Sequence, residues 1–313
     1  MAEVYTLGES MARISSTITG PLRHAHALGL GVAGAESNVA IGLARLGVDS
    51  RWLGRVGDDE FGRLITSVLR GEGVTADAIV DDVANTGLLF KERRTVEHSK
   101  VLYYRRASAG SRLTPEDVDR AAIEAASVLH VTGITLALSD TARAAVDHAI
   151  DIAREVGTTV SFDVNYRKTL WKDGEAGEVL RGVAARADIL FAGVAEARLL
   201  VDSADDDRLV DALAELGAAE VVVKRGAAGA TAIIDGARYE APVFRVTEID
   251  PVGAGDAFTA GYLAEFVTGG SPEQRLTTAA QCGAFAVTVE GDWEGLPSRE
   301  DLHLLDQAGE VHR

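Results

Sequence analysis

The feature of this 313-residue sequence that most restricts its fold is an alternation of short apolar runs with longer amphipathic runs. The expected strands are residues 4–7, 50–53, 128–131, 159–162, 189–191 and 220–223. The expected helices are residues 36–46, 59–69, 139–156 and 175–186. Strands that alternate with helices usually join as parallel strands through crossover helices. The pattern therefore predicts an α/β fold built on a doubly wound, mainly parallel sheet.

Two stretches break this alternation, because they contain short β-like runs with no long helix between them. They are residues 10–32 and 85–106. We expect them to form a small β-sheet that stands off the main domain as a lid. The α/β core would then comprise residues 1–9, 33–84 and 107–313. The acidic segment 202–207 is expected to be the solvated start of a helix.

Composition excludes several classes of function. The net charge of −17 argues against nucleic acid or an anionic membrane as the main partner. No apolar run has the roughly 18–20 residues of a membrane span, and the N-terminus lacks the plan of a signal peptide. A single cysteine, Cys282, excludes an intrachain disulfide framework. The sequence thus predicts a cytoplasmic protein.

The stretch DPVGAGDAF at 250–258 joins a glycine loop and two carboxylates to the start of an apolar helix. The first N–H groups of a helix lack intrahelical partners and carry the positive end of its dipole, so they suit an anion. Small residues at 253–255 let an oxyanion approach the backbone closely. Asp256 is then either a plain helix-start residue or a general base that takes a proton from a hydroxyl while the amides hold a phosphoryl group.

Polar residues follow other expected strands at places that suit a ligand. Ligands of open parallel sheets lie beyond the carboxyl ends of the strands, and Asp163, Asn165 and Arg167 come directly after the strand 159–162. The strand at 220–223 runs into KRGAAG, a small-residue corner that could clasp a nucleotide. No G-x-x-x-x-G-K-[ST] run occurs, so the chain is not a P-loop NTPase.

Together these motifs resemble those of the ribokinase-type (PfkB) carbohydrate kinases over nearly the entire chain. The motifs that carry the resemblance are GES at 8–10, GAESNVAIGLARLG at 34–47, GRVGDDEFG at 54–62 and DPVGAGDAF at 250–258. The motifs that resemble the branch acting on 2-keto-3-deoxygluconate are YYRRASAGS at 103–111, GIT at 133–135, DVNYRKTLW at 163–171 and KRGAAG at 224–229. The resemblance implies a Rossmann-like, ribokinase-like core and a β-lid that often mediates dimers.

The resemblance also implies a role for individual residues. Asp256 would be the general base, and the residues whose N–H groups would form the anion hole for the γ-phosphoryl group of ATP are Gly253, Ala254 and Gly255. The residues that would contact a sugar acid are Gly34, Asn38, Tyr103, Arg105 and Arg167. The residues that would bind the nucleotide are Lys224, Gly226, Gly229, Asp163 and Asn165. Glu196 would organise Mg²⁺ and the phosphates, and the loop around Asp250 is a candidate site for K⁺.

Three positions depart from the family pattern. Ala33-Gly34 replaces a common pair of glycines, and Gly193 stands where Asn or Ser is usual, three residues before Glu196. Near the adenine, Ala279-Ala280-Gln281 lacks an Asn that the family often has. The leading expectation is ATP-dependent phosphorylation of a sugar acid. A kinase of a neutral sugar or a nucleoside, and a sugar-binding regulator without catalysis, remain as alternatives.

Overall fold

The computed structural model describes residues 4–95, 98–203 and 205–305. Its main sheet consists of β1 Val4–Leu7, β4 Ser50–Gly57, β5 Thr75–Asp81, β8 Val128–Thr132, β9 Thr159–Asp163, β10 Ile189–Gly193, β11 Glu220–Lys224, β12 Ala230–Ile234 and β13 Ala237–Glu240. Their order is β13-β12-β11-β10-β9-β8-β1-β4-β5. All neighbours are parallel except β11–β12 and β12–β13. The expected strands coincide with six of these, and the predicted fold class is confirmed.

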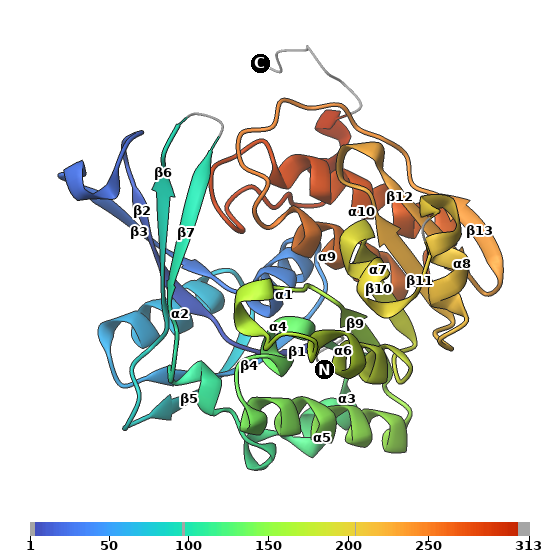
Figure 1. The fold of residues 1–313 in the computed structure, drawn as a ribbon, viewed down its shortest axis with the longest axis horizontal. Helices are drawn as coiled ribbons and strands as arrows, with labels where there is room; N and C mark the ends of the chain where they lie inside the picture. Colours follow the sequence, from blue (N-terminus) through green and yellow to red (C-terminus); the bar gives the residue numbers. More distant parts are fainter. Residues whose placement is uncertain (1–3, 96–97, 204, 306–313) are drawn as a thin grey trace.

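Helices cover both faces of the main sheet (Figure 1). One face packs against α1 Ala35–Arg45, α2 Glu60–Gly71, α9 Ala254–Val267 and α10 Pro272–Ala286. The other packs against α3 Arg120–Ala125, α4 Gly133–Leu136, α5 Asp140–Val156, α6 Ala176–Ala184, α7 Val194–Leu200 and α8 Leu209–Ala214. Each face has its own continuous cluster of buried apolar side chains. Burial of apolar surface on both sides of the sheet is the main stabilising term in such a three-layer fold.

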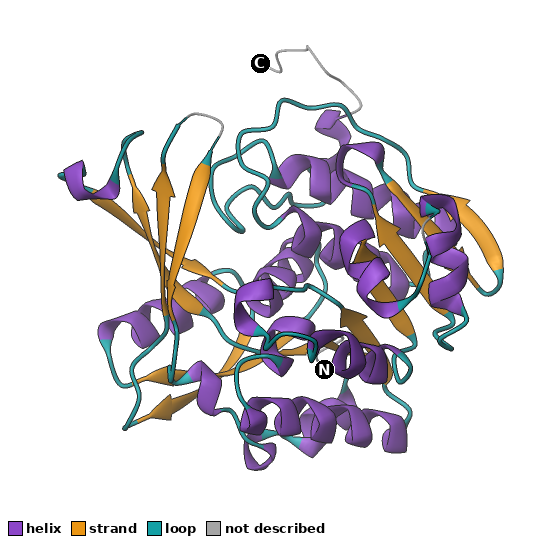
Figure 2. Cartoon of the chain, in the orientation of Figure 1, coloured by secondary structure: helices purple, strands orange, loops and turns teal. Residues whose placement is uncertain are grey.

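A second sheet, the lid sheet, stands off one end of this core (Figure 2). It consists of β2 Met11–Ser16, β3 Leu28–Ala33, β6 Leu88–Arg93 and β7 Ser99–Tyr104, in the order β3-β2-β6-β7. The pair β2–β6 is parallel and the outer pairs are antiparallel. Among the described residues its buried apolar cluster is small, namely Met11, Ala33 and Leu89. The lid sheet therefore depends on contacts with the core.

Asp59 fixes the joint between the lid sheet and the core. It caps the N-terminus of α2 by accepting from Gly62 N at 2.8 Å. The same carboxylate accepts from Thr86 N at 2.9 Å and from Thr86 Oγ1 at 2.8 Å. Because Thr86 lies two residues before β6, a helix cap of the core also anchors a lid strand. A carboxylate that accepts several hydrogen bonds favours its ionised form, and these contacts hold the pKa of Asp59 below its usual value despite the opposing effect of burial.

Successive strands are added on one side of β1 as far as β5 and on its other side from β8 onward. This change of direction at β1 is where a ligand crevice is expected. β1 pairs with β4 on one side and β8 on the other. Ligands of doubly wound sheets bind at such a switch point, outside the carboxyl ends of the strands. The carboxyl ends of β9, β10 and β11 are Asp163, Gly193 and Lys224.

Two further features concern the sequence expectations. The acidic segment 202–207 runs into a 3-10 turn, Asp206–Arg208, and α8 begins only at Leu209. Residues 1–3, 96–97 and 204, which fall within the expected core, lid and acidic segment, lie outside the described residues. Over the described ranges, no helix is both long and apolar enough to cross a membrane.

Candidate active site

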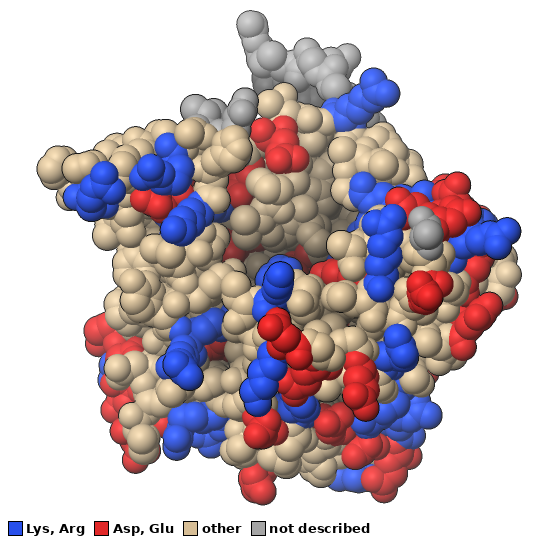
Figure 3. Space-filling view, viewed as in Figure 1, with Lys and Arg blue, Asp and Glu red and all other residues tan. Residues whose placement is uncertain are grey.

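A cleft of about 680 Å³ lies between the lid sheet and the carboxyl ends of the parallel strands. Figure 3 shows the surface hollowed between the lid sheet and the core, with acidic side chains visible inside the hollow. The sequence-predicted site residues that line the cleft are Gly34, Asn38, Tyr103, Arg105, Asp163, Asn165, Arg167, Glu196, Lys224, Gly253, Gly255 and Asp256. Residues more than 200 positions apart in the sequence are thereby brought to one place.

Asp256, in the first turn of α9, is held by two neutral amides from other elements. Asn38 Nδ2 donates to Asp256 Oδ2 at 2.8 Å, and Asn165 Nδ2 donates to Oδ1 at 3.4 Å. Burial raises the pKa of Asp256 to about 7, an effect that the Asn38 hydrogen bond opposes and that nearby Asp163 reinforces. A carboxyl with a pKa near neutrality both accepts and releases a proton readily, as a general base requires.

The backbone before Asp256 has the geometry expected of an anion-binding helix start. Gly253 is the N-cap of α9 with φ +80°, and a Cβ there would come 1.8 Å from Asp292 O, so only glycine fits. The first helical hydrogen bond runs from Ala257 N to Gly253 O at 2.8 Å. The N–H of Ala254 is directed at Pro251 O, 3.4 Å away, and the residue does not line the cleft, so its place in the anion hole stays a prediction.

Lys224, which is partly buried, forms an ion pair with the buried Asp163 close to Asp256. Lys224 Nζ lies 2.6 Å from Asp163 Oδ2. Burial alone would lower the pKa of Lys224, but the carboxylates of Asp163, Glu196 and Asp256 outweigh it and raise the pKa. Lys224 therefore stays charged in the cleft and can meet a phosphate as a point charge.

The two carboxylates that could serve Mg²⁺ differ in their free oxygens. Both oxygens of Glu196 accept from backbone: Oε2 from Gly193 N at 2.7 Å and Oε1 from Tyr166 N at 2.8 Å. Asp163 Oδ1 is buried and has no hydrogen-bond partner within the part of the chain that the structure describes. In that part, no group of three or more His, Cys, Asp and Glu side chains could hold a metal by itself. A magnesium ion that arrives on nucleotide phosphates needs only one or two protein carboxylates, and Asp163 fits that need better than Glu196.

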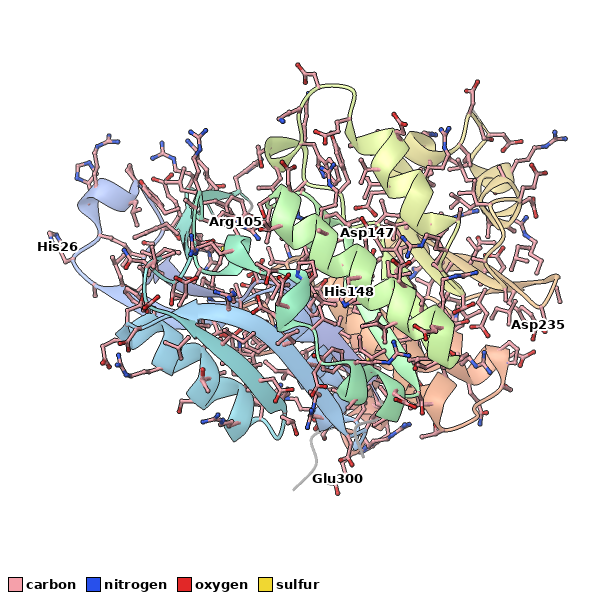
Figure 4. All side chains as sticks on the ribbon, turned by 90° about the horizontal axis from the view of Figure 1, so that it is seen from below. His26, Arg105, Asp147, His148, Asp235 and Glu300 are labelled. Atoms are coloured by element: carbon pink, nitrogen blue, oxygen red, sulfur yellow. The ribbon has the colours of Figure 1, made fainter. Side chains whose placement is uncertain are left out.

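The two arginines expected to contact the sugar acid differ in whether their charge is already paired within the protein. Arg105 is buried and already paired with Glu9: Nε and Nη2 lie 2.7 and 2.6 Å from Glu9 Oε2. Figure 4 labels Arg105, which lies inside the molecule between the lid end marked by His26 and the core. Arg167 is exposed in the cleft, where its Nη1 donates to Tyr166 O at 3.3 Å. Arg167 therefore has the more available charge.

Some predicted residues lie outside the cleft lining. Gly226 and Gly229 form the corner after β11 with φ +57° and +84°. Gln281, which stands in the stretch that departs from the family near the adenine, is buried in α10 and donates to Leu302 O at 3.3 Å. The nucleotide roles of the two glycines remain predictions.

Sequence reasoning missed a set of ion pairs between the lid sheet and the core. Lys91 of β6 pairs with Asp250, and Arg13 of β2 pairs with Asp292 at 2.8 Å and also with Glu294. All these side chains except Glu294 are at least nine-tenths buried. The available signal was the position of Arg13 and Lys91 within short strands whose alternate residues face the cleft.

Comparison with known proteins identifies the family. Residues 1–299 match the pfkB family of carbohydrate kinases. The chain belongs to this family, and it is therefore a carbohydrate kinase, as the resemblance of its motifs implies.

Several curated relatives are similar to the chain over nearly its whole length. The 2-dehydro-3-deoxygluconokinases of Thermoproteus tenax and Bacillus subtilis are 38% and 37% identical, over 97% and 99% of this chain and 94% and 98% of theirs. The 2-dehydro-3-deoxygalactonokinase of Haloferax volcanii is 35% identical over 93% of this chain and 92% of its own. Relatives named as kinases of sugar acids thus stand on both sides of the gluconate–galactonate distinction.

Solved structures show the same fold with ligands. An E. coli protein described as a ribokinase II, in complex with ATP and Mg²⁺, has a TM-score of 0.91 and 28% identity, covering 98% of this chain and 99% of its own. A double mutant of the fructokinase of Vibrio cholerae O395, in a fructose, ADP and potassium ion bound form, has a TM-score of 0.86 and 27% identity, covering 97% of this chain and 98% of its own. These ligands are those of the neighbours.

The contacts of Asp256 predict how activity depends on pH. With Asp256 as the base, kcat/KM should fall as the pH drops through about 7, where the carboxylate takes up a proton. Asn38→Ala removes the hydrogen bond that favours the carboxylate, so the acidic limb should move to higher pH. Asn165→Gly should move it less, because its contact is longer and glycine tolerates the φ of +36° at this position.

The measurement is kcat/KM against pH for the wild type and both variants at saturating Mg²⁺. Titration of the nucleotide affects all three proteins equally, so the comparison between them cancels it. An acidic limb that stays in place in Asn38→Ala would show that Asp256 is not the group that titrates.

Proposed function

We propose that this kinase transfers the γ-phosphoryl group of ATP to 2-keto-3-deoxygluconate (also called 2-dehydro-3-deoxygluconate), giving 2-keto-3-deoxy-6-phosphogluconate. The observation that carries the proposal is the position of Asp256. Its carboxyl has a raised pKa and stands beside an anion-binding helix start, in a cleft where Arg167 offers an available guanidinium. The names of the relatives support the same substrate class.

The residues of the chain divide the work of phosphoryl transfer. Bound MgATP would supply the phosphoryl group and neutralise part of its charge. Asp256 takes the proton of the attacking hydroxyl, while Asn38 and Asn165 hold its carboxylate in place. The N–H groups of Gly253 and Gly255 stabilise the negative charge on the phosphoryl oxygens, Lys224 meets the phosphates, and Asp163 offers its free oxygen to the cation. The lid sheet excludes water that would otherwise compete with the sugar.

A sugar acid is favoured over a neutral sugar by the available charge in the cleft. A guanidinium binds a carboxylate in bidentate fashion, which a hydroxyl cannot match. Arg105 contributes shape more than charge, because Glu9 neutralises it and Tyr103 lies against it, 5.6 Å from guanidinium carbon to ring centre. A kinase of fructose, ribose or a nucleoside is the alternative within enzymes. The intact Asp256 argues against a regulator without catalysis.

Loss of the base gives the first test. Asp256→Asn should lower kcat by roughly 10²–10⁴, the usual size of a general-base contribution, with substrate binding nearly intact. The fold should survive, because the raised pKa means that the ionised carboxylate is disfavoured in the folded protein at pH 8. Coupled ADP release, calorimetric binding of the sugar acid and thermal unfolding measure the three effects.

Asp58→Asn is the matched control, since Asp58 is exposed, lies outside the cleft and pairs with Arg63. This control should keep normal turnover. Near-normal turnover of Asp256→Asn would remove Asp256 from the role of base.

Substrate specificity gives the second test. Arg167→Lys keeps the charge near Asp256 but loses the bidentate fork. The transition-state stabilisation measured by kcat/KM for 2-keto-3-deoxygluconate should therefore fall by about 1–3 kcal/mol. Activity toward fructose, where detectable, should fall much less. Lys168→Met is the control, because the neighbouring Lys168 is exposed and does not line the cleft.

The experiment measures kcat/KM for both acceptors in the three proteins. Equal losses on both acceptors in Arg167→Lys, or a wild-type preference for fructose or ribose, would refute the sugar-acid assignment and leave the kinase assignment intact.

We also propose that two copies of the chain form a dimer through the lid sheet. We further propose that the protein acts in the cytoplasm, where ATP is present. The face of the lid sheet that points away from the cleft is mostly apolar, although it also carries Ser16, Glu92 and Lys100. Its larger apolar side chains are Ile14, Leu28, Leu30, Leu88, Phe90, Leu102 and Tyr104. Leu30 and Tyr104 are 58% and 65% exposed in the single chain. An exposed apolar sheet face is typical of a protein interface.

A charge on this face should separate the copies. Leu30→Asp should convert a dimer into a monomer in analytical ultracentrifugation, because an unpaired carboxylate is costly to bury. Val80→Asp is the control: Val80 is 60% exposed, but it lies on the edge strand β5 of the core. A monomeric wild type, or a dimer that only Val80→Asp disrupts, would refute the lid interface.

A further inference from the structure

The loop around Asp250 is where the resemblance suggests K⁺, and its contacts can be tested for that ion. Asp250 is the acid at the start of DPVGAGDAF, and its side chain is 5% exposed. A monovalent cation bound there would need oxygen atoms that are free to coordinate it. The carboxylate of Asp250 can supply such oxygens only where its present partners leave them free.

Both oxygens of Asp250 already have partners. Oδ1 accepts from Val252 N at 3.3 Å. Oδ2 accepts from Gly291 N at 3.1 Å and binds the ammonium group of Lys91. Lys91 belongs to β6 of the lid sheet and is itself 5% exposed. A positive charge from the chain therefore already neutralises the carboxylate that a cation from solution would use.

The second buried carboxylate of these loops, that of Asp292, also has a cationic partner. Asp292 is paired with Arg13 of β2, and Glu294, which also contacts Arg13, is partly exposed. The two buried acids of these core loops are each matched by one cation of the lid sheet. The pKa of Asp292 is nevertheless raised, mainly by burial, an effect that Arg13 and Lys91 oppose.

We propose that Lys91 is a built-in replacement for a monovalent cation, and that this kinase works without K⁺. The ammonium group is covalently attached to the lid sheet, so it is present whenever the lid sheet is docked on the core. The proposal rests on the kinase activity that family membership gives, and not on the choice of sugar acid.

Lys91 acts as a positioning residue for the anion-binding helix start. The carboxylate that it neutralises is bonded to Val252 N, one residue before Gly253, and to Gly291 N, one residue before Asp292. Gly253 in turn packs directly against Asp292 O. The ion pair thus holds together the two segments that set the place of the amides beside Asp256. Lys91 is also on the cleft face, but its charge is used by Asp250.

The first experiment uses the wild-type protein alone. The kcat and the thermal unfolding temperature are measured in KCl and in tetramethylammonium chloride of equal concentration, so that general screening is matched. We expect both to be the same, with a change in kcat of less than about twofold. A K⁺-specific rise in either quantity would overturn the proposal, because it would demonstrate a potassium site despite Lys91.

The second experiment removes the ammonium group. In tetramethylammonium chloride, Lys91→Ala should lose about 10- to 100-fold in kcat, with a smaller change in KM, because the uncompensated Asp250 no longer holds the loop beside the anion hole. Its unfolding temperature should fall by about 5 °C or more. K⁺ should restore most of both losses, since the vacated space and the freed carboxylate now suit a cation. Lys91→Arg should need no K⁺.

Lys172→Ala is the control, because Lys172 is an exposed lysine that lies outside the lid sheet and does not line the cleft. It should behave as the wild type in both salts. Full activity of Lys91→Ala without K⁺, or losses that K⁺ does not restore, would overturn the proposal. If no sugar acid is phosphorylated, the proposed substrate fails; the unfolding temperatures, which require no acceptor, still decide the role of Lys91.

Discussion

The hydrogen bonds that hold Asp256 are the contacts on which the whole site depends. Asn38 comes from α1, Asn165 from the loop after β9, and Asp256 from α9. These elements belong to different parts of the sequence, and only the docking of α1 and α9 on the same face of the sheet brings them together. The carboxylate proposed as the base is therefore placed by rigid elements, whereas a base on a free loop would lose much of its positional advantage.

The same arrangement explains why this carboxyl is costly for the fold. An aspartate ionises at 3.8 in the unfolded chain and at about 7 here. As the pH rises from 3.8 through about 7, the unfolded state releases its proton first, so the folded state loses stability over that window. The loss is at most about 4 kcal/mol, since one pKa unit corresponds to about 1.4 kcal/mol, and it is smaller because the cleft admits water. The raised pKa of the proposed base therefore costs stability, which the apolar clusters on both faces of the main sheet offset.

The sequence predicted the fold class and many residues of the cleft, but it did not predict which side chains or backbone groups those residues contact. Alternation of strand and helix patterns placed the strand ends, and these placed Asp163, Asn165 and Arg167. Pattern could not show that Glu9 neutralises Arg105 or that both oxygens of Glu196 bind backbone N–H groups, because such pairs join segments distant in the sequence. Asp59 has a local partner, because it caps α2 through Gly62 N, but its second contact, with Thr86, also joins segments distant in the sequence.

The proposed role of Lys91 couples docking of the lid sheet to the order of the segment before Asp256. The lid sheet has a small apolar cluster of its own, and two of its basic side chains are buried against core acids. Breaking such buried pairs by moving the lid sheet away would expose Asp250 and Asp292 to water but leave the loops around Gly253 without their cationic partners. In the proposed mechanism, the amides beside Asp256 are best ordered when the lid sheet covers the cleft. The proposed anion hole is then less ordered when the lid sheet is open, so the contacts that prepare transfer to the sugar also disfavour transfer to water.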